Sequence, residues 1–299
     1  MDAYALLLAA ALNAGTVLAL ASLGLLVNEK AGVVNLGAEG MMLCAALAGF
    51  ATVAHTGSDL AGFAAGMAAG ALLAALFGAL VIGLRANPYA TGLALSLLGA
   101  GLSAFAGAGY VQTRLPPRPH FALGGLADIP FIGPALLRQH PLVYGAALLA
   151  LALIWWLGRT RAGLTLRAVG ESPEAAHALG WPVRRIQWAA VIFGGALCGL
   201  AGAYLSIVYT PLWAEGMVAG KGWIALALTS FAAWRPARAL LGAYLLGGVT
   251  VGQLYLQGQG VPVPAPLLSM LPYLAVIAAL ALISWRSKAG RHHTHPCEP

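Results

Sequence analysis

Apolar residues along this chain fall into long, nearly uninterrupted runs, and charged residues are confined to the short segments between them. The stretches without Asp, Glu, Lys or Arg are 3–28, 40–58, 60–84, 86–113, 139–158, 186–214, 222–234 and 239–285. About 20 apolar residues in a helix span the hydrocarbon core of a bilayer. Backbone groups in hydrocarbon must be paired internally, and the runs lack the alternation of a strand, so the pattern predicts membrane-spanning helices.

We expect nine spans, or eight to ten if one segment is re-entrant. The last long run is divided at "QGQGVPVPAP", because its glycines and prolines predict a loop. The N-terminal run lacks a basic leading region and is expected to be retained as the first span. The nine expected spans are 3–27, 31–54, 60–84, 89–110, 140–158, 187–209, 217–234, 239–258 and 266–285.

Composition agrees with a membrane protein. Hydrophobic residues make up 60% of the 299 residues and charged residues only 8%, whereas about 25% of a soluble domain is charged. The expected fold is therefore an all-α integral membrane protein, a single domain over 1–299 with an inside loop at 159–186 and a flexible tail at 286–299. The net charge of +7 is read as membrane orientation, and we expect no nucleic-acid partner.

The distribution of basic residues predicts the orientation. With the N-terminus outside, the C-terminus is cytoplasmic and the inside segments hold twelve of the 16 Lys and Arg residues. These are Lys30, Arg85, the five arginines of 159–186, Arg235, Arg238, Arg286, Lys288 and Arg291, against Arg114, Arg118, Arg138 and Lys221 outside.

Small residues recur at intervals of four within the third span. Gly62, Gly66, Gly70, Ala74 and Gly78 form one ridge, and the sixth span carries Gly195 and Gly199 with the same spacing. Such ridges let membrane helices approach closely. The pattern predicts tightly packed helices in one compact bundle.

No group of residues in the sequence predicts covalent chemistry. There is no HExxH motif, catalytic triad or paired-carboxylate site, so we expect neither an enzyme nor a cofactor. His292, His293, His295 and Cys297 allow a metal site, but a solvated tail explains them better and we expect no metal.

The inside loop 159–186 predicts one short helix. Ser172 is a good N-cap, Pro173 suits the first helical position, and Gly180 suits the end. A helix near 173–179 is consistent with an ordinary connector and with a docking element for a cytoplasmic partner.

The segment "NEKAGVVNLGAEGMM" (28–42) concentrates charge between two apolar runs. Lys30 follows the inside bias, and Glu29 beside it is expected to be solvated. Glu39 lies about two turns into the next span, where contact with lipid would be costly. We expect Glu39 to bond to a neighbouring helix, and a place on a transport path stays open as the alternative.

Four segments carry a resemblance to a known family. They are "LVNEKAGVVNLGAEGMML" (26–43), "NPYATGLALSLLGAGL" (87–102), "LRAVGESPEAAHALG" (166–180) and "GKGWIALALTSFAAWRPARALLGAYLLGG" (220–248). They cover about a third of the chain, in order. The chain resembles permease subunits of ATP-binding-cassette importers for branched-chain amino acids, ribose-like sugars and nucleosides, and is most similar to the nucleoside and simple-sugar branch.

The resemblance implies a bacterial plasma-membrane location and three protein partners. They are a cytoplasmic ABC ATPase, an extracytoplasmic solute-binding protein and a second permease subunit, with a heterodimer favoured and a homodimer possible. Membrane lipid is the expected partner of Arg167, Arg184 and Arg185, with acidic groups on the ATPase as the alternative. The residues implied to couple to the ATPase are Pro173, Glu174, Ala175, Ala176, Leu179 and Gly180.

The substrate path is weakly determined by the sequence. The candidate residues are Asn35, Glu39, Thr91 and Ser96, although hydroxyl groups in membrane helices usually bond to their own backbone. Alternative functions are an ABC permease for branched-chain amino acids and an ATP-independent transporter or channel. The substrate itself is not identifiable from these patterns.

Overall fold

The chain is a bundle of helices with one pair of very short strands. The computed structural model describes residues 2–111, 113–116, 121–122, 133–260, 263–278 and 281. The α-helices are α1 (Asp2–Lys30), α2 (Ala38–Thr56), α3 (Asp59–Gly78), α4 (Pro88–Gly107), α5 (Pro141–Arg159), α6 (Arg161–Glu171), α7 (Pro173–Ala178), α8 (Val183–Tyr204), α9 (Lys221–Phe231), α10 (Pro236–Gly258) and α11 (Ala265–Ser269). Shorter elements are η1 (Ala79–Gly83), η2 (Ala108–Tyr110), η4 (Gly133–Leu137), η5 (Leu205–Tyr209), β1 (Phe121–Ala122) and β2 (Arg138–Gln139).

Seven helices in the described residues are long and apolar enough to cross a membrane. They cover Tyr4–Lys30, Ala38–Thr56, Asp59–Gly83, Pro88–Tyr110, Pro141–Arg159, Val183–Tyr209 and Pro236–Gly258. These match seven of the nine expected spans. The other two are not confirmed as crossings: the seventh, 217–234, contains only the 11-residue α9, and the ninth, 266–285, extends beyond the described residues.

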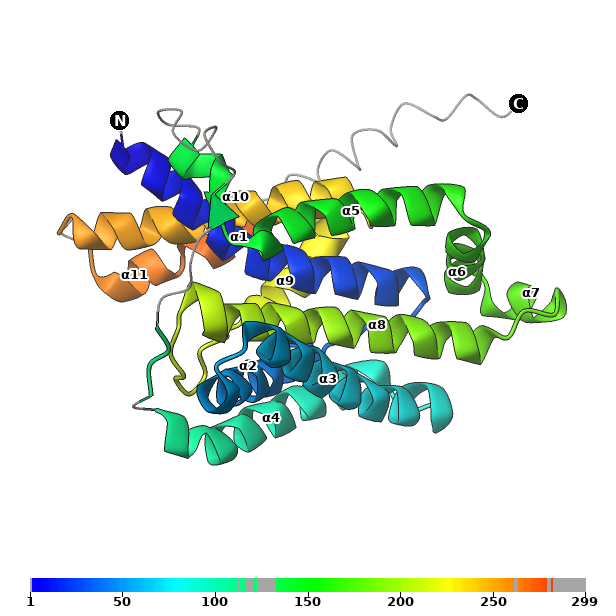
Figure 1. Cartoon of the computed structure of the whole chain (residues 1–299). Coiled ribbons are helices and arrows are strands. Elements are labelled where there is room, and N and C mark those ends of the chain that lie inside the picture. Colours follow the sequence, from blue (N-terminus) through cyan, green and yellow to red (C-terminus); the bar gives the residue numbers. More distant parts are fainter. Residues whose placement is uncertain are drawn as a thin grey trace, which may run out of the picture.

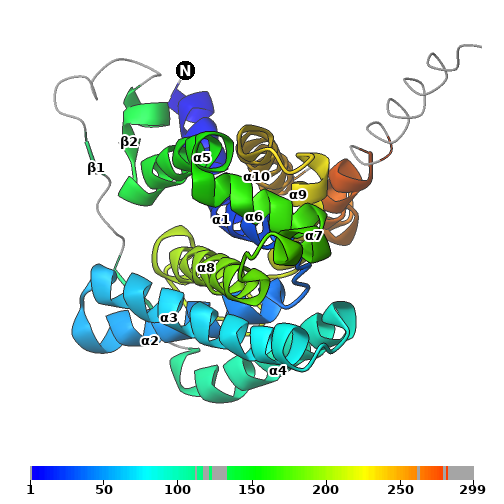
Figure 2. The same ribbon diagram turned by 90° about the vertical axis from the view of Figure 1, so that its right-hand side faces the viewer.

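Helices α1, α2 and α8 form the centre of the bundle. Most of their residues are buried, whereas only about a third of the residues of α3, α4, α5 and α10 are buried. Figure 1 shows the long helices side by side, with α6 and α7 at one end and the N-terminus at the other. Figure 2 is viewed with the α6–α7 end facing the reader. It shows α2, α3 and α4 on one side of α8, and α5, α9 and α10 on the other side of α1.

Glycines make the closest helix crossings, as predicted. All five residues of the ridge in α3 are buried, and α3 packs against α8. A Cβ atom on Gly70 would overlap the Gly195 carbonyl oxygen, and one on Gly199 would overlap that of Gly66. Without a Cβ the two backbones approach closely, which drives association where no hydrophobic effect acts between helices.

The chain is irregular at two places inside the bundle. Residues 31–37 interrupt the path from α1 to α2, and residues 210–220 separate η5 from α9. Gly32, Gly216 and Gly220 have positive φ angles there, which glycine adopts at little cost. Irregular backbone at membrane depth is tolerated where it is buried in protein or lines a water-filled cavity, so these two segments mark candidate functional positions.

Candidate functional site

The first irregular segment is held by side chains from within the bundle. Asn35 is fully buried, and its Oδ1 accepts a hydrogen bond from the Gly37 backbone N–H at 2.9 Å. Ser96 of α4 donates from Oγ to the Leu36 carbonyl oxygen at 2.8 Å. Two of the predicted path residues, Asn35 and Ser96, therefore hold the same segment before α2, where their bonds satisfy backbone groups outside any helix.

Glu39, in the first turn of α2, connects the end of the first irregular segment to the end of the second. Its Oε1 accepts a hydrogen bond from the Gly220 N–H at 2.7 Å, and its Oε2 accepts one from the Gly222 N–H at 2.8 Å. These donors lie at the N-terminus of α9, where N–H groups have no partner within the helix and the helix dipole favours an anion. The expected bond from Glu39 to a neighbouring helix is confirmed.

The other end of α9 is fixed at the end of α1. Glu29 accepts hydrogen bonds from Thr229 Oγ1 at 2.6 Å and from Trp234 Nε1 at 2.5 Å, and Lys30 lies over the Trp234 ring with its Nζ 5.9 Å from the ring centroid. The expectation of a merely solvated Glu29 is wrong, because its partners lie about 200 positions away in the sequence and no local pattern indicates them.

These contacts give the depth at which α9 begins. Eleven helical residues at about 1.5 Å each span about 16 Å, and a bilayer core is about 30 Å thick. With its C-terminal end tied to the end of α1, α9 begins about halfway through the bundle. Lys221, counted among the outside residues near the start of the expected span 217–234, is the first residue of α9 and is half-buried.

A cavity of about 200 Å³ lies between the first irregular segment and α9. Asn35, Leu36 and Ala38 form one wall, and α9 forms the other. The α9 residues lining it are Gly222, Trp223, Leu226, Ala227 and Ser230. Trp223 is 48% exposed and Ser230 is also exposed, so an indole ring and a hydroxyl face this space, whereas the amide of the fully buried Asn35 is bonded within the protein.

The predicted path residues are thus only partly brought together. Asn35 lines the cavity, and Glu39 lies directly behind it through its bond to Gly222. Ser96 holds the same segment through Leu36, whereas Thr91 is a half-buried residue of α4 that does not line the cavity. Trp223 and Ser230 were not predicted as path residues; their spacing of seven along an apolar helix places them on one face.

The second candidate site surrounds α7. The predicted helix of the 159–186 loop is confirmed as Pro173–Ala178, with Ser172 Oγ accepting a hydrogen bond from the Ala175 N–H at 3.3 Å. Gly180 has a φ of +82°, which ends the helix as expected. The preceding helix α6 was not predicted.

The surface of α7 is open. Of the six residues predicted for coupling, Ala176 is buried, and the others are exposed; they are Pro173, Glu174, Ala175, Leu179 and Gly180. Leu179 is 78% exposed. A large exposed apolar side chain beside exposed charge is typical of a protein contact surface.

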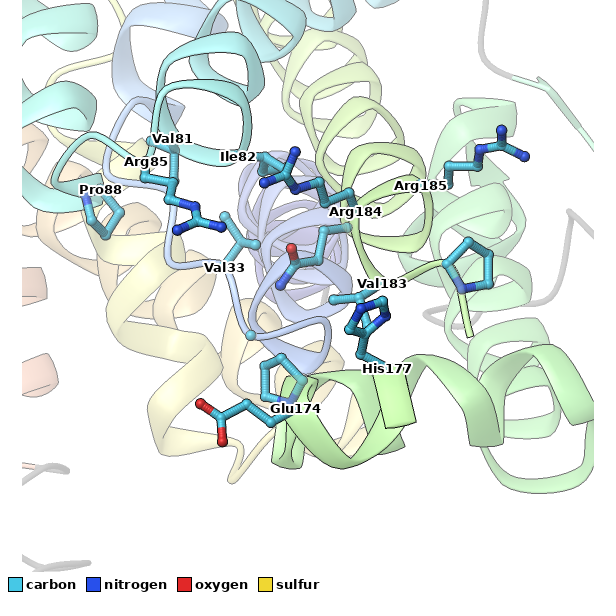
Figure 3. A pocket seen from close by; sticks show the side chains of 14 residues that line it. Val33, Val81, Ile82, Arg85, Pro88, Glu174, His177, Val183, Arg184 and Arg185 are labelled. Carbon is cyan, nitrogen blue, oxygen red and sulfur yellow. The ribbon is translucent and has the colours of Figure 1, made fainter. Parts of the chain in front are cut away.

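A cavity of about 730 Å³ separates α7 from the ends of α1, η1, α4 and α8. Figure 3 shows Glu174 and His177 of α7 on one side of it and Arg85 and Pro88 on the other. Gly32 and Val33 also line it, so the pocket reaches the first irregular segment. Lys30, Arg85 and the 159–186 loop share one end of the bundle, as predicted, while the side of the membrane stays a prediction.

Helix α6 touches the same irregular segment. A Cβ on Gly170 would overlap the Lys30 carbonyl oxygen, and one on Gly32 would lie 3.3 Å from the Gly170 Cα. Because α7 follows α6 after one residue, the exposed helix is connected by tight backbone packing to the chain that leads to Asn35 and Glu39.

Comparison with known proteins gives consistent relatives. The family model described as branched-chain amino acid transport system / permease component matches residues 7–281. TsgC13 of Haloferax volcanii, provisionally named a glucose ABC transporter permease protein, is 43% identical over 95% of this chain and 93% of its own length. No solved structure matches the chain.

Two relatives are named for nucleosides. The nucleoside ABC transporter permease protein NupC of Lactococcus lactis is 32% identical over 92% of this chain and 91% of its own length. The guanosine ABC transporter permease protein NupQ of Bacillus subtilis is 32% identical over 93% of this chain and 92% of its own length. With the family model matching nearly the full chain, and seven candidate membrane spans, the protein belongs to the ABC transporter permeases of the branched-chain amino acid transport system family.

Proposed function

We propose that the chain imports a nucleoside or a simple sugar, as one of two permease subunits served by a separate ATPase and a solute-binding protein. The observation that supports a path through this chain is the 200 Å³ cavity between the first irregular segment and the short helix α9. Binding sites in membrane transporters are commonly formed by such interrupted helices.

The cavity lining favours an uncharged polar solute. Ser230 offers a hydroxyl group, Trp223 offers an aromatic face, and none of the lining residues carries a charge. Hydroxyl-rich rings and nucleobases bind to this combination, because the aromatic face accepts the flat side of the ring and the polar groups fix its orientation. The printed names of the relatives, for glucose, nucleosides and guanosine, lie in the same chemical range.

The charge of Glu39 does not argue against a neutral substrate. Both of its carboxylate oxygens accept backbone hydrogen bonds from the start of α9, so the anion site at this helix end is occupied by the protein itself. A substrate anion would compete with a built-in carboxylate there, which supports nucleosides over nucleotides.

The ATPase contact is proposed at α7, on the coupling residues Pro173, Glu174, Ala175, Ala176, Leu179 and Gly180. A short rigid helix between two membrane helices transmits a partner's closure as a rigid-body movement. Its exposed Leu179 and its connection through α6 to the Lys30–Gly32 turn support this assignment over an ordinary connector. The N-terminus is proposed to lie outside, which puts α7 in the cytoplasm.

Uptake by a strain lacking the chromosomal copy tests both parts of the proposal. Glu174→Arg on α7 is expected to abolish uptake while the protein reaches the membrane at the wild-type level. The matched control is Glu171→Arg, an exposed position at the end of α6. Wild-type uptake after deletion of 172–180 would refute the coupling role.

The substrate is tested on the cognate solute-binding protein. A thermal-shift screen of nucleosides, simple sugars and branched-chain amino acids is expected to show stabilisation by one of the first two classes, because ligand binding to the native state raises its melting temperature. Stabilisation by amino acids alone would refute the substrate class. Failure of an ATPase to copurify in mild detergent would favour the ATP-independent alternative.

A further inference from the structure

A large apolar groove lies on the outer surface near the α6–α7 end, away from the candidate path. It has a volume of about 900 Å³ and is bounded by α5, α6 and α8. Its walls include Trp155, Trp156, Trp181 and Phe193, and its base includes Val27 of α1. Apart from Arg161 and Thr165, its lining residues are apolar.

The aromatic walls are open to the surroundings. Trp155 is 63% exposed, Trp181 45% and Phe193 38%. Tryptophan is enriched where a membrane protein crosses from hydrocarbon to headgroups. In a bilayer such a hollow is filled by acyl chains unless protein covers it, and the concave shape distinguishes it from an ordinary lipid-facing helix.

Arg161 gives the groove a charged rim. It is exposed at the first position of α6 and is the one charged residue among those lining the groove. Guanidinium groups bind phosphate oxygens through two parallel hydrogen bonds. Thr165 lies one turn further along α6, and its Oγ1 donates to the Arg161 carbonyl oxygen at 2.8 Å, which leaves the guanidinium as the ligand-binding group.

An apolar groove with a cation at its rim complements an anionic phospholipid. We propose that the groove binds one such lipid, with an acyl chain between α5 and α8 and its phosphate on Arg161. The site adjoins both flanks of α7, because α6 precedes that helix and Trp181–Pro182 follow it. The bound lipid therefore braces the connections through which α7 is held.

Native mass spectrometry of the purified full chain tests this site. Phosphatidylglycerol added to the delipidated protein is expected to give one retained lipid per chain, bound at least tenfold more tightly than phosphatidylcholine. Arg161→Gln is expected to remove that preference, with Arg238→Gln, an exposed arginine of α10 outside the groove, as the matched control.

A second variant tests the apolar part. Ala189 lines the groove and is exposed, so Ala189→Phe is expected to reduce phosphatidylglycerol retention several-fold without changing the melting temperature of the lipid-free protein. Ala106→Phe, on the exposed face of α4, should leave retention unchanged.

Two results would overturn the proposal. Equal retention of both lipids, insensitive to Arg161→Gln and Ala189→Phe, would show only non-selective surrounding lipid. Loss of a dimer in Ala189→Phe, with lipid retention unaffected, would show that protein rather than lipid covers the groove. Neither result bears on substrate uptake, so the test is independent of the proposed transport function.

Discussion

The Gly220 and Gly222 N–H groups both donate to the Glu39 carboxylate, and this pair of hydrogen bonds, called the clasp below, holds the start of α9. Replacement of Glu39 by Gln keeps the size of the side chain and one carbonyl oxygen. The other oxygen becomes an NH₂ group, a donor facing a backbone N–H donor, either at Gly220 or at Gly222. The start of α9 then loses one of its two side-chain acceptors and the carboxylate charge.

The structure sets the size of the effect. Hydrogen bonds to charged groups contribute about 1.5–3 kcal/mol each, and a neutral one contributes about 1 kcal/mol. Two charged bonds in the native protein against one neutral bond in Glu39→Gln give a loss of about 2–5 kcal/mol. For a protein of this size, each kcal/mol shifts the melting temperature by about 2–4 °C, so we expect a decrease of about 4–20 °C.

Two assays check this prediction. Thermal unfolding in detergent gives the melting temperature, and hydrogen–deuterium exchange of peptides over 218–224 reports the two amides directly. Glu215→Gln is the matched control, because Glu215 lies in the same irregular segment and is exposed. A melting temperature within 1 °C of wild type, with unchanged exchange over 218–224, would refute the reasoning.

Uptake measured on the same variant separates two roles of Glu39. Reduced uptake in proportion to reduced protein in the membrane indicates that the clasp supports assembly. Lost uptake at an undiminished protein level indicates that the position of α9, or Glu39 itself, acts in transport.

Three further changes test the surrounding architecture. Gly170→Ala places a Cβ against the Lys30 carbonyl and should lower uptake several-fold at normal expression, whereas Gly158→Ala on α5 has open space and should not. Gly70→Ala should lower the melting temperature through about 1–3 kcal/mol of overpacking, and Gly101→Ala, with no atom nearby, should not. Ser172→Ala removes the cap of α7, and it should cost about 1 kcal/mol locally, seen as faster exchange over 173–178 without a change in the melting temperature.

Much of the bundle is predictable because its determinants are local. Hydropathy gives six of the expected spans to within about four residues, and it places the second span correctly except that the helix begins at Ala38 rather than at 31. The four-residue spacing of the α3 ridge indicates its packing face, since a helical stripe of glycines leaves few alternatives to close contact. The cap, proline and terminal glycine around α7 likewise act within a single turn, so the sequence contains the information needed to place that helix.

The interrupted helices are not predictable in the same way. The segment 217–234 is expected to be a short span, but α9 is fixed in position by Glu39 at one end and by Glu29 at the other. Those contacts join residues about 180 and 200 positions apart, and hydropathy contains no information about them. The local signal in the sequence is the pair Gly216 and Gly220, because glycines before an apolar run permit positive φ angles, and both adopt them here.

The contacts around these interruptions connect the two candidate sites. Gly170 of α6 packs against the Lys30–Gly32 turn, from which the irregular segment leads through Asn35 to Glu39. Glu39 holds the start of α9, the helix that carries the exposed Trp223 into the cavity. A tilt of α7 and α6 therefore moves the chain leading to Asn35 before it strains the long helices, since 31–37 lacks the hydrogen-bond ladder that makes a helix rigid. We therefore expect the cavity to open and close without bending of α1 or α8, because their glycine-mediated crossings allow little displacement.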